Sequence, residues 1–142
     1  STTTNTGDIV GVCMGGSYVN SSGQTVQGQY IPALASTASN LAYAYVVDDP
    51  TALFKVAVVT SGTTMGTAGR TVVGSNLPLV LNPGNTNTGN SAFAVTLTGA
   101  GTTAAIPIRV IDVVPETATA ADTYTELLVK INNHQYNDTT GV

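Results

Sequence analysis

The chain has 142 residues and a mass of 14.3 kDa, which is the size of one domain. Four basic and eight acidic side chains give a net charge of -4 without any basic run, so we expect no nucleic-acid partner. No apolar stretch approaches the roughly 20 residues that span a bilayer, so we expect no membrane partner either.

Uncharged polar residues replace the missing charges. The sequence holds 24 Thr, 11 Asn, 9 Ser and 15 Gly, whereas a soluble domain usually draws about a quarter of its residues from Asp, Glu, Lys and Arg. For a compact monomer of this mass, we expect roughly 6,800 Å² of accessible surface. A surface with so few charged side chains is typical of a protein that contacts other protein subunits.

The first third predicts strands joined by turns. A hairpin joins residues 17–19 to residues 24–26 through Asn20-Ser21-Ser22-Gly23, because Asn and Gly adopt left-handed backbone angles at low cost. The Ala-rich stretch 33–40 is the one helical candidate, and it is too short for a stable helix by itself.

The next strand, residues 41–47, alternates large and small side chains, so we expect the face with the large side chains to lie against the core. That face carries Leu41, Tyr43, Tyr45 and Val47. Asp48-Asp49-Pro50 predicts a turn, with the carboxylates capping neighbouring amides, and the returning strand 54–58 is expected to complete a second hairpin.

The middle of the chain predicts loops and short strands. Residues 61–70 have almost no apolar anchor and are expected to form a long loop, followed by two short strands around Gly74-Ser75-Asn76. Residues 82–90 form a turn-rich link to a strand that carries Phe93, Val95 and Leu97 on one side.

Two strong strands close the chain. Ile106, Ile108 and Val110 share one face, and Leu127, Val129 and Ile131 share another, with Glu126 and Lys130 pointing away. Pro107 places the first strand at or near a sheet edge. We therefore expect residues 1–142 to form a single all-β domain, a compact β-sandwich or barrel-like fold with long loops and a flexible N-terminal arm over residues 1–7.

The residues that carry chemistry are few. His134, the single histidine, lies in a polar stretch where a side-chain hydrogen bond or solvent exposure is the ordinary outcome. Cys13 lies in an apolar run and is expected to be buried. Gly89-Asn90-Ser91 lacks the second glycine of a nucleophile elbow, and the adjacent Asp48 and Asp49 would point apart. We expect no enzyme, no metal, no cofactor and no small-molecule substrate.

Four segments resemble small virion proteins that accompany the major capsid protein of tailed double-stranded DNA bacteriophages. They are residues 47–56, residues 86–91, residues 108–115 and the closing Leu128-Val129-Lys130-Ile131-Asn132-Asn133-His134-Gln135-Tyr136. The chain is similar in these segments to head decoration, or cement, proteins.

The resemblance implies a protein without enzymatic activity, made in the host cytoplasm and placed on the capsid exterior of the virion. It implies a homotrimer that binds the phage major capsid protein and stabilises the mature head. Because decoration proteins have several unrelated folds, the resemblance does not fix the topology. The alternative is a receptor-binding or fibre-associated β module of the virion.

The N-terminal segment is our candidate for the contact with the capsid. Its residues are Ser1, Thr2, Thr3, Thr4, Asn5 and Thr6. They have no apolar periodicity to dock them on their own core, and an extended arm spans about 3.3 Å per residue. We expect this arm to gain hydrogen bonds and buried area on assembly.

Overall fold

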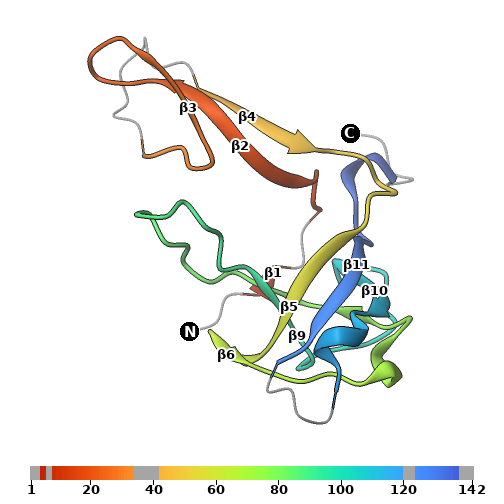
Figure 1. Cartoon of the computed structure of the whole chain (residues 1–142). Helices are drawn as coiled ribbons and strands as arrows, with labels where there is room; N and C mark the ends of the chain where they lie inside the picture. Colours follow the sequence, from red (N-terminus) through yellow and green to blue (C-terminus); the bar gives the residue numbers. More distant parts are fainter. Residues whose placement is uncertain (1–3, 6–7, 34–41, 120–123, 138–142) are drawn as a thin grey trace.

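The computed structural model describes residues 4–5, 8–33, 42–119 and 124–137 of the chain, and it consists of strands with three short 3-10 turns. The all-β class predicted from the sequence is confirmed. The strands form an eight-stranded sheet and a separate three-stranded sheet that extends away from it (Figure 1). The predicted helix falls almost entirely outside the described residues.

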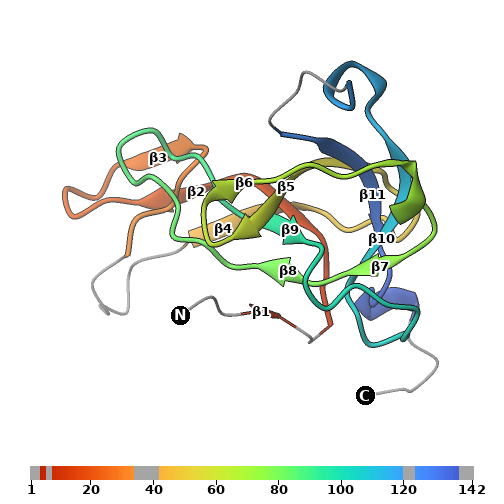
Figure 2. The ribbon, with the colours of Figure 1, turned by 90° about the horizontal axis from the view of Figure 1, so that it is seen from below.

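The larger sheet curls into a nearly closed barrel (Figure 2). Its order is β1-β8-β9-β5-β11-β10-β7, with β6 paired to β5. The strands are β1 (Thr4–Asn5), β5 (Phe54–Ser61), β6 (Thr64–Met65), β7 (Asn76–Leu77), β8 (Leu79–Val80), β9 (Ala94–Thr96), β10 (Ile108–Val113) and β11 (Glu126–Ile131).

Pro78 explains how the barrel closes. It alone separates β7, which pairs with β10, from β8, which pairs with β9 at the other end of the sheet. Proline has no N–H for the ladder, so the strand changes partners at this residue. The Pro78 carbonyl still accepts a hydrogen bond from the Thr96 N–H at 3.2 Å.

The core fills the inside of this barrel. Alternate residues of β10 and β11 are buried, including Ile108, Val110, Leu127, Val129 and Ile131, as their period of two predicts. Pro107 directly precedes β10, which pairs from its first residue with both β11 and the end strand β7, so this strand lies next to the edge of the sheet and not at it.

The predictions for the middle of the chain are correct only in part. Thr64 and Met65 form β6, a hairpin with β5 whose turn places Gly62 at a φ of +53°, so residues 61–70 are not one long loop. The 3-10 turn η1 (Arg70–Val72) replaces one of the short strands expected near Gly74. Of the three side chains expected on one side of a strand, Val95 is buried, whereas Phe93 and Leu97 are 52% and 36% exposed.

The smaller sheet has the order β3-β2-β4, formed by β2 (Val12–Val19), β3 (Thr25–Gly28) and β4 (Ala42–Val47). The β2–β3 hairpin matches the sequence prediction. Gly23 has a φ of +76°, and the Asn20 side-chain oxygen accepts hydrogen bonds from the Ser22 and Gln24 N–H groups.

The second predicted hairpin is wrong. β4 pairs with β2, whereas β5 pairs with β11 and β9 in the barrel. The intervening residues 48–53 are longer than a tight two-residue turn, so they carry the chain from one sheet to the other.

We predict that the barrel core supplies most of the stability. Leu127 in β11 has no exposed surface, so L127A should lower the free energy of unfolding by about 2–5 kcal/mol. L53A makes the same change at a residue that is 50% exposed and should cost less than about 1 kcal/mol. Urea unfolding measures both, and equal losses would contradict this assignment of the core.

Candidate interaction surface

Two tyrosines of the smaller sheet face solvent. Tyr43 is 60% exposed and Tyr45 is 50% exposed, so the prediction that this side of β4 faces the core is wrong. Their cross-strand partners on β2 are Ser17 and Gly15, which are too small to cover the rings. We call these four residues the tyrosine face. Leu41, predicted to share it, lies outside the described residues.

The opposite side of this sheet is partly covered. The chain after β3 places the Ile31 side chain over Gly16 in β2, where a Cβ atom would collide with Ile31 and with the Tyr43 carbonyl. Glycine is therefore required at this close approach. On the tyrosine face Tyr43 and Tyr45 remain 60% and 50% exposed, and on the opposite side Val46 is 40% exposed.

Cys13 also differs from its prediction. The thiol belongs to an exposed residue of β2 and is not in the core, because β2 lies outside the barrel. Other apolar side chains of this part of the chain are exposed as well: Val10, Val12, Met14, Tyr30 and Val46.

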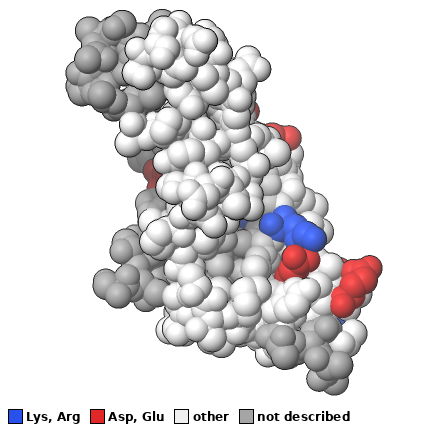
Figure 3. Space-filling model, turned by 60° about the vertical axis from the view of Figure 1, so that its left-hand side comes forward, with Lys and Arg blue, Asp and Glu red and all other residues white. Residues whose placement is uncertain are grey.

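The region around the tyrosine face carries no charge. Residues 9–47 contain no Asp, Glu, Lys, Arg or His. Most of the face shown in Figure 3 is white and therefore uncharged, and the blue and red residues that touch lie toward the lower, barrel end. The ion pairs found among the described residues, Lys55–Glu126 at 2.9 Å and Arg70–Asp112 at 3.3 Å, both belong to the barrel. The absence of charge over residues 9–47 is the signal in the sequence that could have pointed to the tyrosine face.

A polar loop of the barrel side supports the smaller sheet. The Gln29 Nε2 donates a hydrogen bond to the Asn90 Oδ1 at 2.9 Å. Gly89, with a φ of +73°, lies so close to Tyr30 that a Cβ atom there would stand 3.0 Å from the Tyr30 Cβ. The loop thus fixes the chain that leaves β3.

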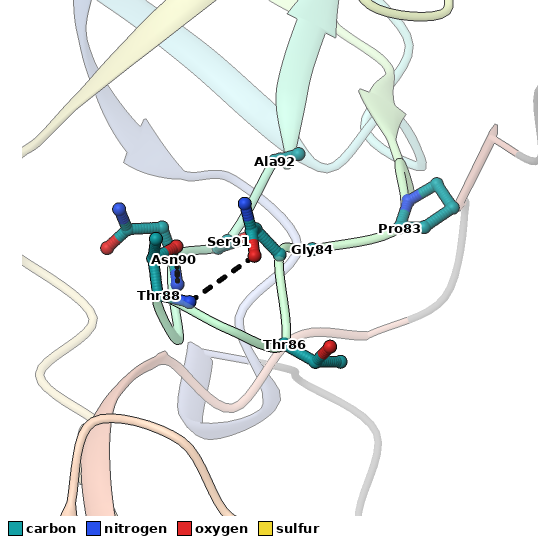
Figure 4. Close-up of a pocket in the computed structure, with 8 residues that line it drawn as sticks. Pro83, Gly84, Thr86, Thr88, Asn90, Ser91 and Ala92 are labelled. Atoms are coloured by element: carbon teal, nitrogen blue, oxygen red, sulfur yellow. Dashed lines mark hydrogen bonds between the residues drawn. The ribbon is translucent and has the colours of Figure 1, made fainter.

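The same loop encloses an open pocket of about 560 Å³ (Figure 4). Its lining comes from the stretch between Pro83 and Ala92, and its polar residues are Asn85, Thr86, Thr88, Asn90 and Ser91. The Asn85 Oδ1 accepts hydrogen bonds from the Asn87 and Thr88 N–H groups, so it serves the turn itself. The lining holds no charged side chain, and the Ser91 Oγ of the incomplete elbow accepts a hydrogen bond from the Phe93 N–H at 3.2 Å.

His134 lies elsewhere, at the end of β11. It is 2% exposed, and its Nδ1 accepts a hydrogen bond from the Tyr136 N–H at 3.1 Å. Its Nε2 is buried and has no hydrogen-bond partner among the described residues. The side-chain hydrogen bond is as predicted, and it uses one ring nitrogen for a local turn.

Asp49 caps the turn between the two sheets, as the sequence predicts. Its Oδ1 accepts hydrogen bonds from the Thr51 Oγ1 and the Thr51 N–H, both at 2.7 Å. These bonds to the charged form lower the pKa of Asp49 below 3.8.

The N-terminal arm is only partly described. Thr4 and Asn5 form β1 and pair with Val80 and Leu79 of β8, so at these two residues the chain docks on its own barrel, contrary to our expectation. A two-residue backbone pairing needs no apolar periodicity, which is why the sequence pattern missed it. Ser1, Thr2, Thr3 and Thr6 lie outside the described residues.

Two other kinds of feature are absent from the described part of the chain. No three His, Cys, Asp or Glu side chains gather there as metal ligands. No helix there has the length and hydropathy to cross a membrane. Comparisons with family models, curated proteins and solved structures yielded no match.

We predict a pH-dependent contribution from the Asp49 cap. Because its pKa is lowered by folding, the charged carboxylate stabilises the fold above pH 3.8, and this contribution is lost as the pH falls through the folded pKa. D49N keeps an acceptor oxygen without the charge. Its melting temperature should lie below that of the wild type at neutral pH, and the gap should close in acid.

The matched control is D48N, which changes the neighbouring carboxylate that makes no such bonds to Thr51. Thermal melts followed by circular dichroism across this pH range make the comparison. A D49N gap that stays constant down to about pH 2 would refute the role of the charge.

Proposed function

We propose that this protein is a structural virion subunit, a head decoration protein that binds the outer surface of a phage capsid as a homotrimer and stabilises the mature head. The observation that carries the proposal is the uncharged smaller sheet, which stands away from the barrel with an apolar face open to solvent. Burying such a surface against neighbours avoids the desolvation cost of charged groups.

The resemblance of four segments to decoration proteins supports the same role. Three of them fall on defined parts of the barrel or its connection: residues 47–56 lead into β5, residues 108–115 include β10, and residues 128–136 include most of β11. The fourth, residues 86–91, lies in the loop that supports the smaller sheet. The resemblance therefore follows structural elements, including the loop at the base of the candidate surface.

Function as a non-enzymatic protein fits the chemistry of the described residues. Nucleophilic catalysis requires a base beside a hydroxyl or thiol. His134 is buried at the end of β11 with its Nδ1 bonded to a backbone amide, and Cys13 belongs to the smaller sheet. The positions of His134 and Cys13 therefore favour binding of the capsid protein over catalysis as the function.

Counting copies on capsids tests the proposal. The purified chain is mixed with undecorated capsids of the phage that encodes it, and bound copies are measured by sedimentation. A head decoration protein should saturate at many copies, in a fixed ratio to the major capsid protein. Absence of binding, or saturation at a few copies per particle, would overturn the assignment.

The second candidate is a receptor-binding or fibre-associated module. The exposed Tyr43 and Tyr45 favour it, because a pair of aromatic rings on one face is a common platform for sugar rings. This alternative predicts few copies per virion and binding to host glycans that is lost in the Y43S Y45S variant.

The N-terminal arm gives a sharper prediction about the capsid contact. We propose that Ser1 to Thr6 contribute much of the attachment through uncharged hydrogen bonds. A variant that begins at Gly7 should bind capsids more weakly than the full chain. The contribution of the arm should change little between about 0.1 M and 1 M salt, although screening shortens from about 10 Å to 3 Å.

A variant that begins at Thr4 is the matched control, because it keeps the β1–β8 pairing. Comparing the two truncations separates contacts of the first three residues from loss of β1, and thermal melts of both report any change in the barrel. If both truncated proteins bind as tightly as the full chain, the attachment surface must lie on the folded body.

A further inference from the structure

The chain exposes more surface than a compact monomer should. Its accessible area is 8714 Å², against roughly 6,800 Å² for a compact monomer of 14.3 kDa.

The smaller sheet exposes five large apolar side chains: Val12, Met14, Tyr43, Tyr45 and Val46. A strand pair or a three-stranded sheet gains independent stability by burying one apolar face against another layer. The tyrosine face is such a face without a layer: Tyr43 and Tyr45 are 60% and 50% exposed, over Ser17 and Gly15. The other side already has Ile31 packed over Gly16.

From these observations we infer that the tyrosine face is a subunit interface, at which copies of this chain pack their smaller sheets against one another. Each copy supplies the layer that the sheet of its neighbour lacks. Two sheets packed face to face stand about 10 Å apart, which is enough for interleaved tyrosine rings. Aromatic residues are also the side chains most enriched at the centres of interfaces.

Charge explains why the occupant is a second copy. The chain has a net charge of -4, so copies that approached through the charged barrel surfaces would repel one another. Residues 9–47 hold no charged side chain, so two tyrosine faces meet without an unpaired charge on either side. A surface of one charge sign cannot match itself, whereas an uncharged apolar face can.

The inference rests on the proposed function only for the number of copies. Three sheets around one axis would bring three tyrosine faces together and leave the barrels outside, free to contact a capsid. Association in solution needs no capsid, so the interface and the capsid-binding role can fail separately.

The test measures the mass of the full chain by sedimentation equilibrium at micromolar concentration, in low and high salt. We expect a closed oligomer that persists at high salt, since no ion pair contributes to the interface. A wild-type chain that remains monomeric overturns the inference, whatever the variants do. A trimer agrees with the proposed function, and a dimer supports the interface while contradicting the homotrimer.

Variants locate the interface. Y43S Y45S should raise the dissociation constant of the oligomer by at least about tenfold, and Y45K should do the same by placing an unpaired charge on the face. Y43F Y45F keeps both rings and should associate like the wild type. The matched control is Y124S Y136S, which removes two other exposed tyrosines, 44% and 62% exposed, from outside the smaller sheet.

Circular dichroism of each variant checks the fold before the masses are compared. An oligomer that survives both Y43S Y45S and Y45K, or that Y124S Y136S disrupts equally, places the interface elsewhere and overturns the inference. If the chain is monomeric and Y43S Y45S weakens only capsid binding, the tyrosine face binds the capsid protein and not a second copy of the chain. This result also overturns the inference.

Discussion

The buried apolar side chains of the described residues are concentrated in the barrel, and the rest of the structure depends on that distribution. The barrel buries Val58, Leu77, Val95, Val110 and Leu127 in a common core that strands from distant parts of the sequence surround. The smaller sheet has no core of its own. Its central strand is rich in small residues where it passes Tyr43, Tyr45 and Ile31, so both tyrosines stay exposed.

Polar contacts help to join the smaller sheet to the barrel. Asp49 caps the turn that leads from β4 into β5, and the Gln29–Asn90 hydrogen bond ties the end of β3 to the loop before β9. Such contacts fix direction and register but bury little apolar surface. The smaller sheet is therefore held in place by the barrel while its tyrosine face remains available to a partner.

This division of labour connects the structure with the proposed role on a phage head. A decoration protein has to remain folded as a free subunit and to bury a further surface when it assembles. The barrel provides the first property through its own core. In the proposed role the uncharged sheet gains further contacts with another chain, and its attachment tolerates changes in salt because charges contribute little.

The sequence by itself determined the all-β class, the hairpin around Gly23, the Asp49 turn and the buried faces of β10 and β11, because each depends on local turn chemistry or on a period of two. Tertiary structure decided which sheet each strand joins. Alternation in β4 shows that one face carries larger side chains than the other. It does not reveal whether a second layer covers that face, and the structure exposes Tyr43 and Tyr45 where the sequence predicted core. Cys13 is exposed for the same reason. Pairing between β1 and β8 rests on backbone hydrogen bonds, which any residue but proline can donate and which leave no mark in the sequence.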